Sequence, residues 1–339
     1  MEHEIVRPVP LLDEKGDIVE PGWARKLYPV YDRAQVRQGG GRFREWDRYL
    51  IFSPEAILTV SLEDRPGGGL DTVVLLDLQT GAQAGRQFTR KLLPAGLGGN
   101  AARGNASASG KGYGILFHSD GRNRTVTVKI GDFLDGLPLD VHMVLTDLPA
   151  ESLVLSVPLA GQGRFRLSQR LLGMRAEGRI LLGDRQYAFS RDSAAGILDW
   201  TRGVWPKKSH WYWGAASGFV DGLPFGLNIG SSALAEGAPT ENAVLCEGRI
   251  HKLSKVAARI PRDGKVWALD QPWTFHEEMG RLEVAFHPEG EWTERLGGLL
   301  SRGERRQVFG RFSGSAVLDD GQHVDFTGLE GFVERVQDP

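Results

Sequence analysis

The chain has 339 residues, 41% hydrophobic and 25% charged, a composition that supplies a packed core and disfavours disorder. Its 41 basic and 43 acidic residues leave a net charge of −2, without the basic excess expected of a nucleic-acid binder. The single cysteine, Cys246, excludes an intrachain disulfide, and no stretch reaches the ~18 apolar residues of a membrane-spanning helix. The amino terminus lacks the apolar core of a secretory signal, so we expect a cytoplasmic protein.

Residues 1–45 are predicted to form a leading segment without long regular elements, because four prolines interrupt it. Trp23 and Tyr28 are the large side chains expected to hold this segment against a neighbouring surface. Strands are predicted from there onward. Residues alternate between the two faces over Ala56–Leu62, the period of a half-buried strand, and an apolar run follows over Val73–Leu78.

The glycine-rich stretch Gly96–Gly112 is interpreted as a mobile loop. Neither a helix start nor a Lys-Ser/Thr pair follows it, which disfavours a phosphate-binding loop. Beyond this stretch, the alternating segments Thr125–Ile130 and Leu139–Leu145 are joined by turn-rich residues. They are predicted to pair as antiparallel strands.

The second half of the chain contains four predicted hairpins, each with a turn sequence between two apolar segments. The turns are Gly183-Asp184, Asp221-Gly222, Glu247-Gly248 and Asp319-Asp320-Gly321. An Asp-Gly pair supplies the positive φ angles that a tight hairpin turn requires. Hairpins at this density predict a sandwich or a barrel.

The predicted fold class is therefore all-β, as two packed lipocalin-like barrels or curled antiparallel sheets with few short helices. A single β-sandwich with extensions is the alternative. Glu294–Ser301 has the spacing of a short helix, but no strand–helix–strand alternation appears, which disfavours a doubly wound sheet. A proline interrupts the strand pattern at Leu148–Glu151. This interruption predicts an N-terminal β domain over 46–150 and a C-terminal β domain over 151–339.

The densest group of aromatic and ionisable residues lies between Leu198 and Gly218, where four of the nine tryptophans fall. Trp211 and Trp213 are two positions apart, so on a strand they share a face. Together with Trp205 they are predicted to form an aromatic wall for an apolar ligand, and Arg202 belongs to the same cluster. Large core residues are the alternative interpretation, because tryptophan is also a common core filler.

Asp199 precedes a Trp-Pro turn and is expected at the mouth of this wall. A carboxylate against indoles loses solvation, so its pKa is expected to rise toward that of a general acid. A local structural role is the alternative, because an Asp before a turn commonly caps it. Lys207, Lys208 and His210 form either a solvated basic turn or a site for an anionic ligand group.

Two later segments supply further candidates. Antiparallel pairing across the Glu247-Gly248 turn is expected to bring Asn242 near His251, where either a polar pair or plain edge pairing of the strands follows. Either His251 or Glu241 is a candidate to accept a proton. Asn228 lies in the strand after Asp221-Gly222. Arg311 is either a buried counter-ion of Asp199 or Glu241, or a surface residue. The eight histidines lack zinc-like spacing, so neither a metal nor another cofactor is expected.

These segments together resemble the bacterial domain-of-unknown-function family 2804, and the resemblance covers nearly the whole chain. The residues that carry it are Leu198-Asp199, Arg202-Gly203, Trp205-Pro206, Trp211, Trp213, Ser217-Gly218, Gly226-Leu227-Asn228, Thr240–Ala243, Gly248–Leu253 and Val308–Gly314, with Pro8–Leu11 and Gly22–Arg25 at the start. This family implies no activity.

An Asp-x-x-x-Gly segment followed by a Trp-x-Trp strand and an Asp-Gly hairpin is also similar to the lipocalin-like carotenoid hydratase group. That resemblance implies two barrel-like halves and relatives that bind hydrophobic molecules, hydrate isoprenoid double bonds or cyclise terpenoids. It also implicates a Tyr and an Asp. Asp199 matches the Asp, whereas Ile197 stands where the Tyr is expected.

Two functions therefore follow from the sequence. The first is binding of an apolar or amphipathic small molecule, lipid or isoprenoid-like, in an aromatic-lined pocket. The alternative is a metal-independent lyase, hydratase or cyclase with Asp199 as the acid and His251 or Glu241 as the base. The expected partner is a small hydrophobic or amphipathic molecule rather than nucleic acid or a membrane span, and the oligomeric state is left open.

Overall fold

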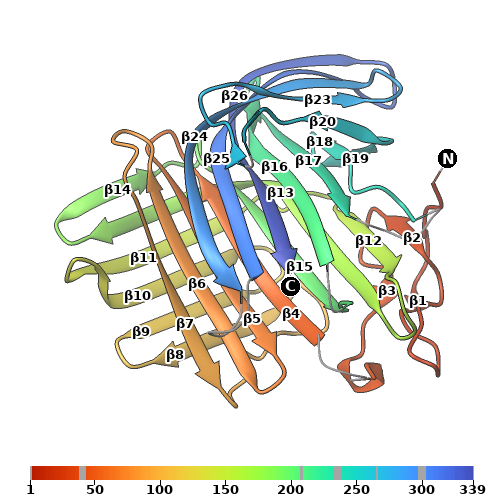
Figure 1. Ribbon diagram of the computed structural model, residues 1–339, viewed down its shortest axis with the longest axis horizontal. Helices are drawn as coiled ribbons and strands as arrows, with labels where there is room; N and C mark the ends of the chain where they lie inside the picture. Colours follow the sequence, from red (N-terminus) through yellow and green to blue (C-terminus); the bar gives the residue numbers. More distant parts are fainter. Residues whose placement is uncertain are drawn as a thin grey trace.

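The computed structural model of the protein describes residues 2–37, 43–206, 209–232, 238–264, 266–296 and 303–338. Within these ranges the chain is almost entirely β, with one 3-10 helix, η1 (Arg33–Gln35), and no α-helix. Most strands belong to two large antiparallel sheets. The larger sheet nearly closes into a barrel and the smaller curls into half of one, which confirms the predicted fold class (Figure 1).

The first sheet contains thirteen strands among the described residues. Its path runs β7-β6-β5-β4-β15-β13-β11-β10-β9-β8, with β2, β12 and β14 attached beside it. The bounds are β2 (Gly22–Ala24), β4 (Phe43–Phe52), β5 (Ala56–Arg65), β6 (Gly68–Asp77), β7 (Gln83–Lys91), β8 (Gly104–Gly110), β9 (Tyr113–Ser119), β10 (Arg124–Leu134), β11 (Leu137–Thr146), β12 (Leu153–Pro158), β13 (Phe165–Leu182), β14 (Arg185–Phe189) and β15 (Ala195–Val204).

Side chains join the two ends of this path, which explains why the sheet almost closes. Phe88 on β7 stacks on Tyr113 of β9 with ring centroids 3.9 Å apart. Arg86, also on β7, donates a hydrogen bond of 3.3 Å to the carbonyl of Asp132 on β10.

The second sheet has nine strands in the described ranges, in the order β19-β18-β17-β16-β26-β25-β24-β23-β20. Two small strand pairs, β1 with β3 and β21 with β22, lie outside both sheets. The bounds are β1 (Val9–Pro10), β3 (Pro29–Val30), β16 (Ser209–Val220), β17 (Leu223–Ser232), β18 (Ala243–Cys246), β19 (Arg249–Lys252), β20 (Val256–Arg259), β21 (Arg262–Asp263), β22 (Val266–Trp267), β23 (Trp273–Glu277), β24 (Leu282–Leu296), β25 (Gly303–Val317) and β26 (His323–Asp338).

The hairpins predicted in the second half are present, and their turns adopt the expected backbone. Asp221 and Gly222 have φ angles of 51° and 78° between β16 and β17. Glu247 and Gly248 have φ angles of 50° and 78° between β18 and β19. Positive φ at both central turn positions matches the right-handed twist of the flanking strands.

The prediction of a mobile loop over Gly96–Gly112 is wrong in part, because Gly104–Gly110 form strand β8. The residues before β8 are held by buried arginines. Arg202 donates a hydrogen bond of 2.8 Å to the carbonyl of Gly98, and Arg124 one of 2.5 Å to that of Ala101.

The helical prediction for Glu294–Ser301 is wrong over its described part. Glu294–Leu296 end strand β24, and the remainder lies outside the described residues. Glu294 is the cross-strand neighbour of Arg305 on β25, and their side chains form an ion pair of 2.6 Å. Hydrogen bonding to β25 satisfies the backbone N–H and C=O groups of these residues better than an isolated helical turn would.

Three apolar clusters fill the fold. One occupies the interior of the first barrel, a second lies inside the curve of the second sheet, and a third packs the two sheets together. The third cluster takes Leu50 and Phe52 from β4, Trp213 from β16 and Phe332 from β26, and Trp23 of the leading segment belongs to it as predicted. The chain changes sheets between Val204 and Ser209. The division into two domains near residue 150 stays a prediction, because the third apolar cluster contains residues of both sheets and joins them.

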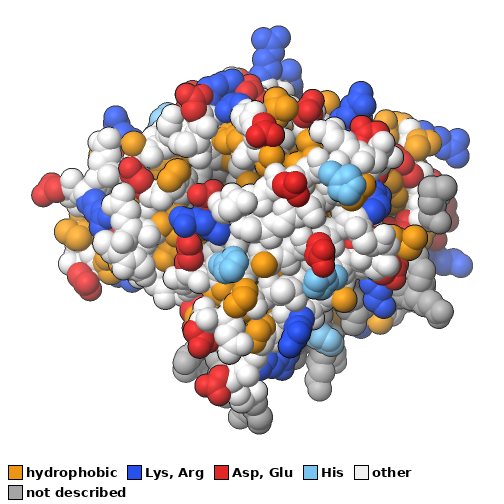
Figure 2. Space-filling view, turned by 90° about the horizontal axis from the view of Figure 1, so that it is seen from above, with side chains coloured by type: hydrophobic (Ala, Val, Ile, Leu, Met, Phe, Trp, Pro, Cys, Tyr) orange, Lys and Arg blue, Asp and Glu red, His pale blue; other side chains and the backbone are white. Residues whose placement is uncertain are grey.

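The face seen from above in Figure 2 carries acidic, basic and histidine side chains intermixed with apolar ones. In the described part of the chain, no helix is long and apolar enough to cross a membrane.

Candidate functional site

The candidate site lies where the two sheets meet, and alternation along β15 determines which side chains reach it. Trp200 packs in the interior of the first barrel, and the guanidinium of Arg202 lies over its ring at 4.1 Å. Asp199 and Thr201 point to the opposite face, toward the second sheet. Asp199 is fully buried in the middle of the strand, so its predicted place at the mouth of an aromatic wall is wrong.

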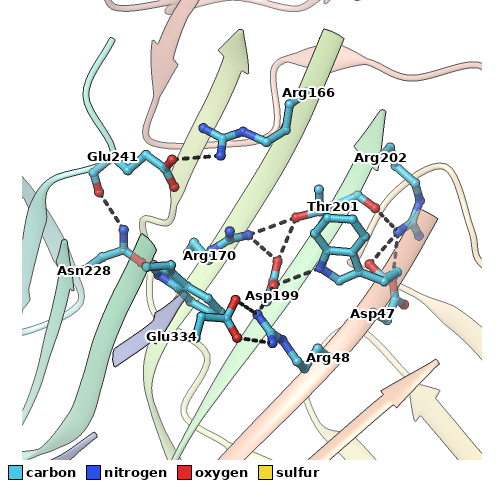
Figure 3. A network of polar contacts seen from close by, with 12 residues as sticks. Asp47, Arg48, Arg166, Arg170, Asp199, Thr201, Arg202, Asn228, Glu241 and Glu334 are labelled. Carbon is cyan, nitrogen blue, oxygen red and sulfur yellow. Dashed lines mark hydrogen bonds and ion pairs between the residues drawn. The ribbon is translucent and has the colours of Figure 1, made fainter. Parts of the chain in front are cut away.

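Asp199 is the centre of a polar network because two arginines flank it on the neighbouring strands. Its cross-strand partners are Arg48 on β4 and Arg170 on β13. Arg48 Nη2 donates to Asp199 Oδ2 at 3.1 Å, and Arg170 Nη1 donates to Oδ1. Trp46 Nε1 donates to Oδ2 at 2.9 Å and Thr201 Oγ1 donates to Oδ1 at 2.7 Å (Figure 3).

This environment reverses the expected pKa shift of Asp199. Burial by itself raises the pKa of a carboxyl group, but the charges of Arg170 and Arg48 favour the ionised form. Together with the hydrogen bonds from Thr201 and Trp46 they hold the pKa of Asp199 below its ordinary value. The prediction of a raised pKa is therefore wrong, because it lacked the two arginines.

Arg48 also connects the first sheet to the second. Its Nη1 donates to Glu334 Oε2 at 2.7 Å and its Nη2 to Glu334 Oε1 at 3.0 Å, a two-pronged contact with β26. Glu334 is 1% exposed. Arg305 Nε lies 3.8 Å from Glu334, and Arg305 in turn pairs with Glu294, so the ionic contacts continue into β24 and β25.

A second branch of the network reaches β17 and the segment before β18. Arg166 on β13 forms an ion pair of 2.8 Å with Glu241. Asn228 Nδ2 donates to the carbonyl of Glu241 at 2.6 Å, and Asn228 Oδ1 accepts from Trp213 Nε1 at 2.8 Å. Glu241 and Asn228 are thus brought to the junction, as the sequence led us to expect, but as partners of Arg166 and Trp213.

The indoles at the junction pack against these arginines. Trp213 is buried, and the guanidinium groups of Arg48 and Arg170 lie 4.8 and 4.4 Å from its ring centroid. Cations over an indole face interact favourably with its electron-rich ring. Trp205 lies against Trp46 with centroids 5.1 Å apart, and Trp211 is partly exposed at the edge. The prediction that Trp211 and Trp213 share a face is confirmed, since both pack with the apolar cluster between the sheets.

The space enclosed by these side chains is small. The cavity has a volume of ≈ 10 Å³, about enough for one water molecule. All four arginines that line it have buried N–H groups without a hydrogen-bond acceptor among the described residues. These groups are Nε of Arg48, Arg170 and Arg305, and both Nε and Nη2 of Arg166.

Other predicted site residues lie elsewhere. Arg202 faces the first barrel, where it pairs with Asp47 at 2.9 Å. His251 lies on β19, pairs with Val244 in register and accepts a hydrogen bond from the Asp319 backbone N–H at 3.2 Å. His210 is exposed on β16. None of the three lines the junction cavity.

For two further residues the structure decides between the alternatives left open by the sequence. Asn242 does not contact His251, because its amide accepts from Gly230 N at 2.9 Å and donates to the carbonyl of Ser254 at 2.8 Å. Arg311 is a partly exposed residue that pairs with Glu289 at 3.0 Å. It is therefore no counter-ion of Asp199 or Glu241. Lys207 and Lys208 lie outside the described residues.

Most of the charged side chains at the junction were not among the residues predicted from the sequence. They are Arg48, Arg166, Arg170, Glu294, Arg305 and Glu334. The pair Arg166 and Arg170 carried a usable signal, because residues four apart on a strand share a face and the intervening Ser168 extends a polar row. No group of three or more His, Cys, Asp or Glu side chains suited to a metal ion occurs in the described ranges.

Comparison with known proteins identifies the family of this chain. A family profile described as Domain of unknown function (DUF2804) matches residues 2–338. The chain belongs to the DUF2804 family. No curated protein matches it.

Solved structures resemble this DUF2804 protein at the level of the fold. A candidate AttH protein from Nitrosomonas europaea has 12% sequence identity and a TM-score of 0.56, with 93% of this chain and 99% of that one covered. Kievitone hydratase from Nectria haematococca has 12% identity and a TM-score of 0.54, with 97% and 98% covered. The predicted likeness to lipocalin-like hydratases is thus confirmed for the fold.

Proposed function

We propose that this protein binds an amphipathic small molecule at the junction of its two sheets. Trp205 and Trp211 would contact the apolar part of the molecule, and the arginines of β13 would hold a head group rich in oxygen atoms. The observation that carries this proposal is the set of buried, unpaired N–H groups on Arg166 and Arg170 beside those indoles.

Buried donors without acceptors are costly, at about 1–3 kcal/mol each and more for charged groups. A carboxylate or carbonyl oxygen placed against Arg166 and Arg170 would remove that cost. Indole faces next to the same donors supply apolar contact area, and such a combination of an apolar wall with a few directed polar groups is typical of small-molecule sites.

Binding must be accompanied by opening of the junction, because the cavity of ≈ 10 Å³ holds no more than about one water molecule. Trp211 is the indole at the edge of the cavity with part of its side chain exposed. Its outward rotation would enlarge the space without disturbing the buried pair of Trp213 and Asn228. We therefore infer a ligand that selects an open conformation.

None of the three residues predicted to carry acid–base chemistry is suited to it in the described part of the junction. Asp199 is ionised, since its pKa is lowered by Arg170 and Arg48. Glu241 is paired with Arg166 at 2.8 Å, and His251 does not line the cavity. A general acid must hold its proton at the working pH, so Asp199 does not meet that requirement.

The test compares two ligands that differ only in the head group, dodecanoate and dodecanol, by quenching of tryptophan fluorescence. Trp211→Ala should weaken both. Arg166→Gln combined with Glu241→Gln removes the arginine without leaving a buried carboxylate alone, and should weaken dodecanoate at least tenfold while changing dodecanol little. Arg311→Gln, on the surface, is the matched control and should change neither.

Equal affinity of the wild type and the double variant for dodecanoate would contradict the proposal. Native mass spectrometry of the freshly purified protein provides an independent check. A co-purified amphipathic molecule should be present in the wild type and depleted in Trp211→Ala.

A further inference from the structure

A second polar cavity lies inside one end of the first barrel, beneath the glycine-rich segment that precedes β8. Its volume is ≈ 130 Å³, and residues of that segment form one side of it. Asp47 and Tyr49 on β4, Phe117 and His118 on β9 and Arg124 on β10 form the other side. Arg48 lies between Asp47 and Tyr49 but points the opposite way, so the β4 wall separates this cavity from the junction.

Arg124 is the unusual group in this cavity. It is 3% exposed, yet it forms no ion pair with any described carboxylate. Its Nη1 donates to the Tyr49 hydroxyl at 3.3 Å and its Nη2 to the carbonyl of Ala101 at 2.5 Å. Its Nε is buried without an acceptor. A buried charge is normally paired, because removing it from water is unfavourable.

The acidic residues near Arg124 are already engaged. Asp47 pairs with Arg202 Nη1 at 2.9 Å. Glu45, which faces the same barrel interior, pairs with Arg33 at 2.8 Å and accepts a hydrogen bond from Tyr31 at 2.6 Å. Arg124 therefore leaves one positive charge without a direct partner next to an open space.

We propose that this cavity binds a small carboxylate as a single anion, with Arg124 as its counter-ion. The volume suits a molecule of a few non-hydrogen atoms. Asp47 also lines the cavity, so its carboxylate disfavours a doubly charged ligand such as phosphate.

The test is isothermal titration calorimetry with sodium acetate, sodium phosphate and sodium chloride at constant ionic strength. Acetate should bind and chloride should not, and phosphate should bind more weakly than acetate. Arg124→Gln should raise the acetate Kd at least tenfold. Ala106→Leu, which fills the cavity and keeps Arg124, should do the same. Arg311→Gln, on the surface and outside both cavities, is the control and should leave acetate binding unchanged.

Acetate binding that survives both Arg124→Gln and Ala106→Leu would overturn the proposal, as would its absence from the wild type. Tighter binding of phosphate than acetate would overturn the assignment to a monoanion. If Arg124→Gln fails to fold, the site is tested in the wild type. Nuclear Overhauser contacts between 13C-labelled acetate and the rings of Tyr49 and Phe117 are then expected. Their absence at saturating acetate counts against the site.

Discussion

Asp199 and Arg48 face each other across β15 and β4 as direct cross-strand partners, with Arg48 Nη2 donating to Asp199 Oδ2 at 3.1 Å. Arg48 Nη1 and Nη2 also donate to the Glu334 carboxylate of the second sheet. One carboxylate therefore orients the arginine that joins the two sheets. This relationship makes the polar junction both a structural connection and the wall of the proposed ligand site.

Asp199→Asn should destabilise the protein by about 3–5 kcal/mol, the range observed when one partner of a buried ion pair is removed. The physical reason is that Arg48 and Arg170 would share a buried site with less negative charge. Urea denaturation followed by circular dichroism measures the change. Asp140→Asn, at an exposed position, is the control. A loss of under about 1 kcal/mol for Asp199→Asn would contradict the role given to this carboxylate.

Stability should fall at acid pH in part through Asp199. Its folded-state pKa is lower than the ordinary value of 3.8, so the unfolded chain binds a proton more readily than the folded one. The resulting stabilisation is present above about pH 4 and is lost as the pH falls toward the depressed pKa. Glu63, whose pKa is lowered to about 2 by Arg65 and Arg44 despite burial, acts in the same direction. Denaturation midpoints between pH 7 and pH 2 should therefore decline less steeply in Asp199→Asn than in the wild type.

Arg48 and Glu334 should be energetically coupled. A double-mutant cycle with Arg48→Met and Glu334→Gln should give an interaction energy of about 1–3 kcal/mol, since the pair is buried and two-pronged. The exposed pair of Lys129 and Asp140, 3.6 Å apart, is the comparison and should give at most about 1 kcal/mol. Equal coupling in the two cycles would mean that burial adds nothing to the contact between the sheets.

The turn between β16 and β17 allows a test of backbone strain alone. Gly222 has φ of 78° and nothing lies within 4 Å of an added Cβ. Gly222→Ala should cost about 1–2 kcal/mol, because only the left-handed conformation is penalised. Gly214→Ala, by contrast, places its Cβ 3.0 Å from Ile229 and tests packing instead. If Gly222→Ala has no effect on thermal unfolding, the turn does not constrain the hairpin.

Local sequence determined the strands and the turns. The alternation over Ala56–Leu62 and the Asp-Gly and Glu-Gly turn pairs depend only on adjacent residues, so the strand and the turns were predicted correctly. The strand is buried on both faces rather than half-buried as expected, because the second face packs in the tertiary structure. The shared face of Trp211 and Trp213 follows from the same two-residue period. The sequence also contained the candidates Asp199, Asn228 and Glu241, which all reach the junction.

Only the tertiary structure decided what these residues do. Arg48, Arg170 and Glu334 lie 151, 29 and 135 positions from Asp199 in the chain, and sheet register alone brings them together. Because a pKa depends on the charges within a few ångströms, the ionised state of Asp199 could not be read from its sequence neighbours. The same holds for Arg124, whose lack of an ion-pair partner among the described residues becomes visible only once the barrel has enclosed it.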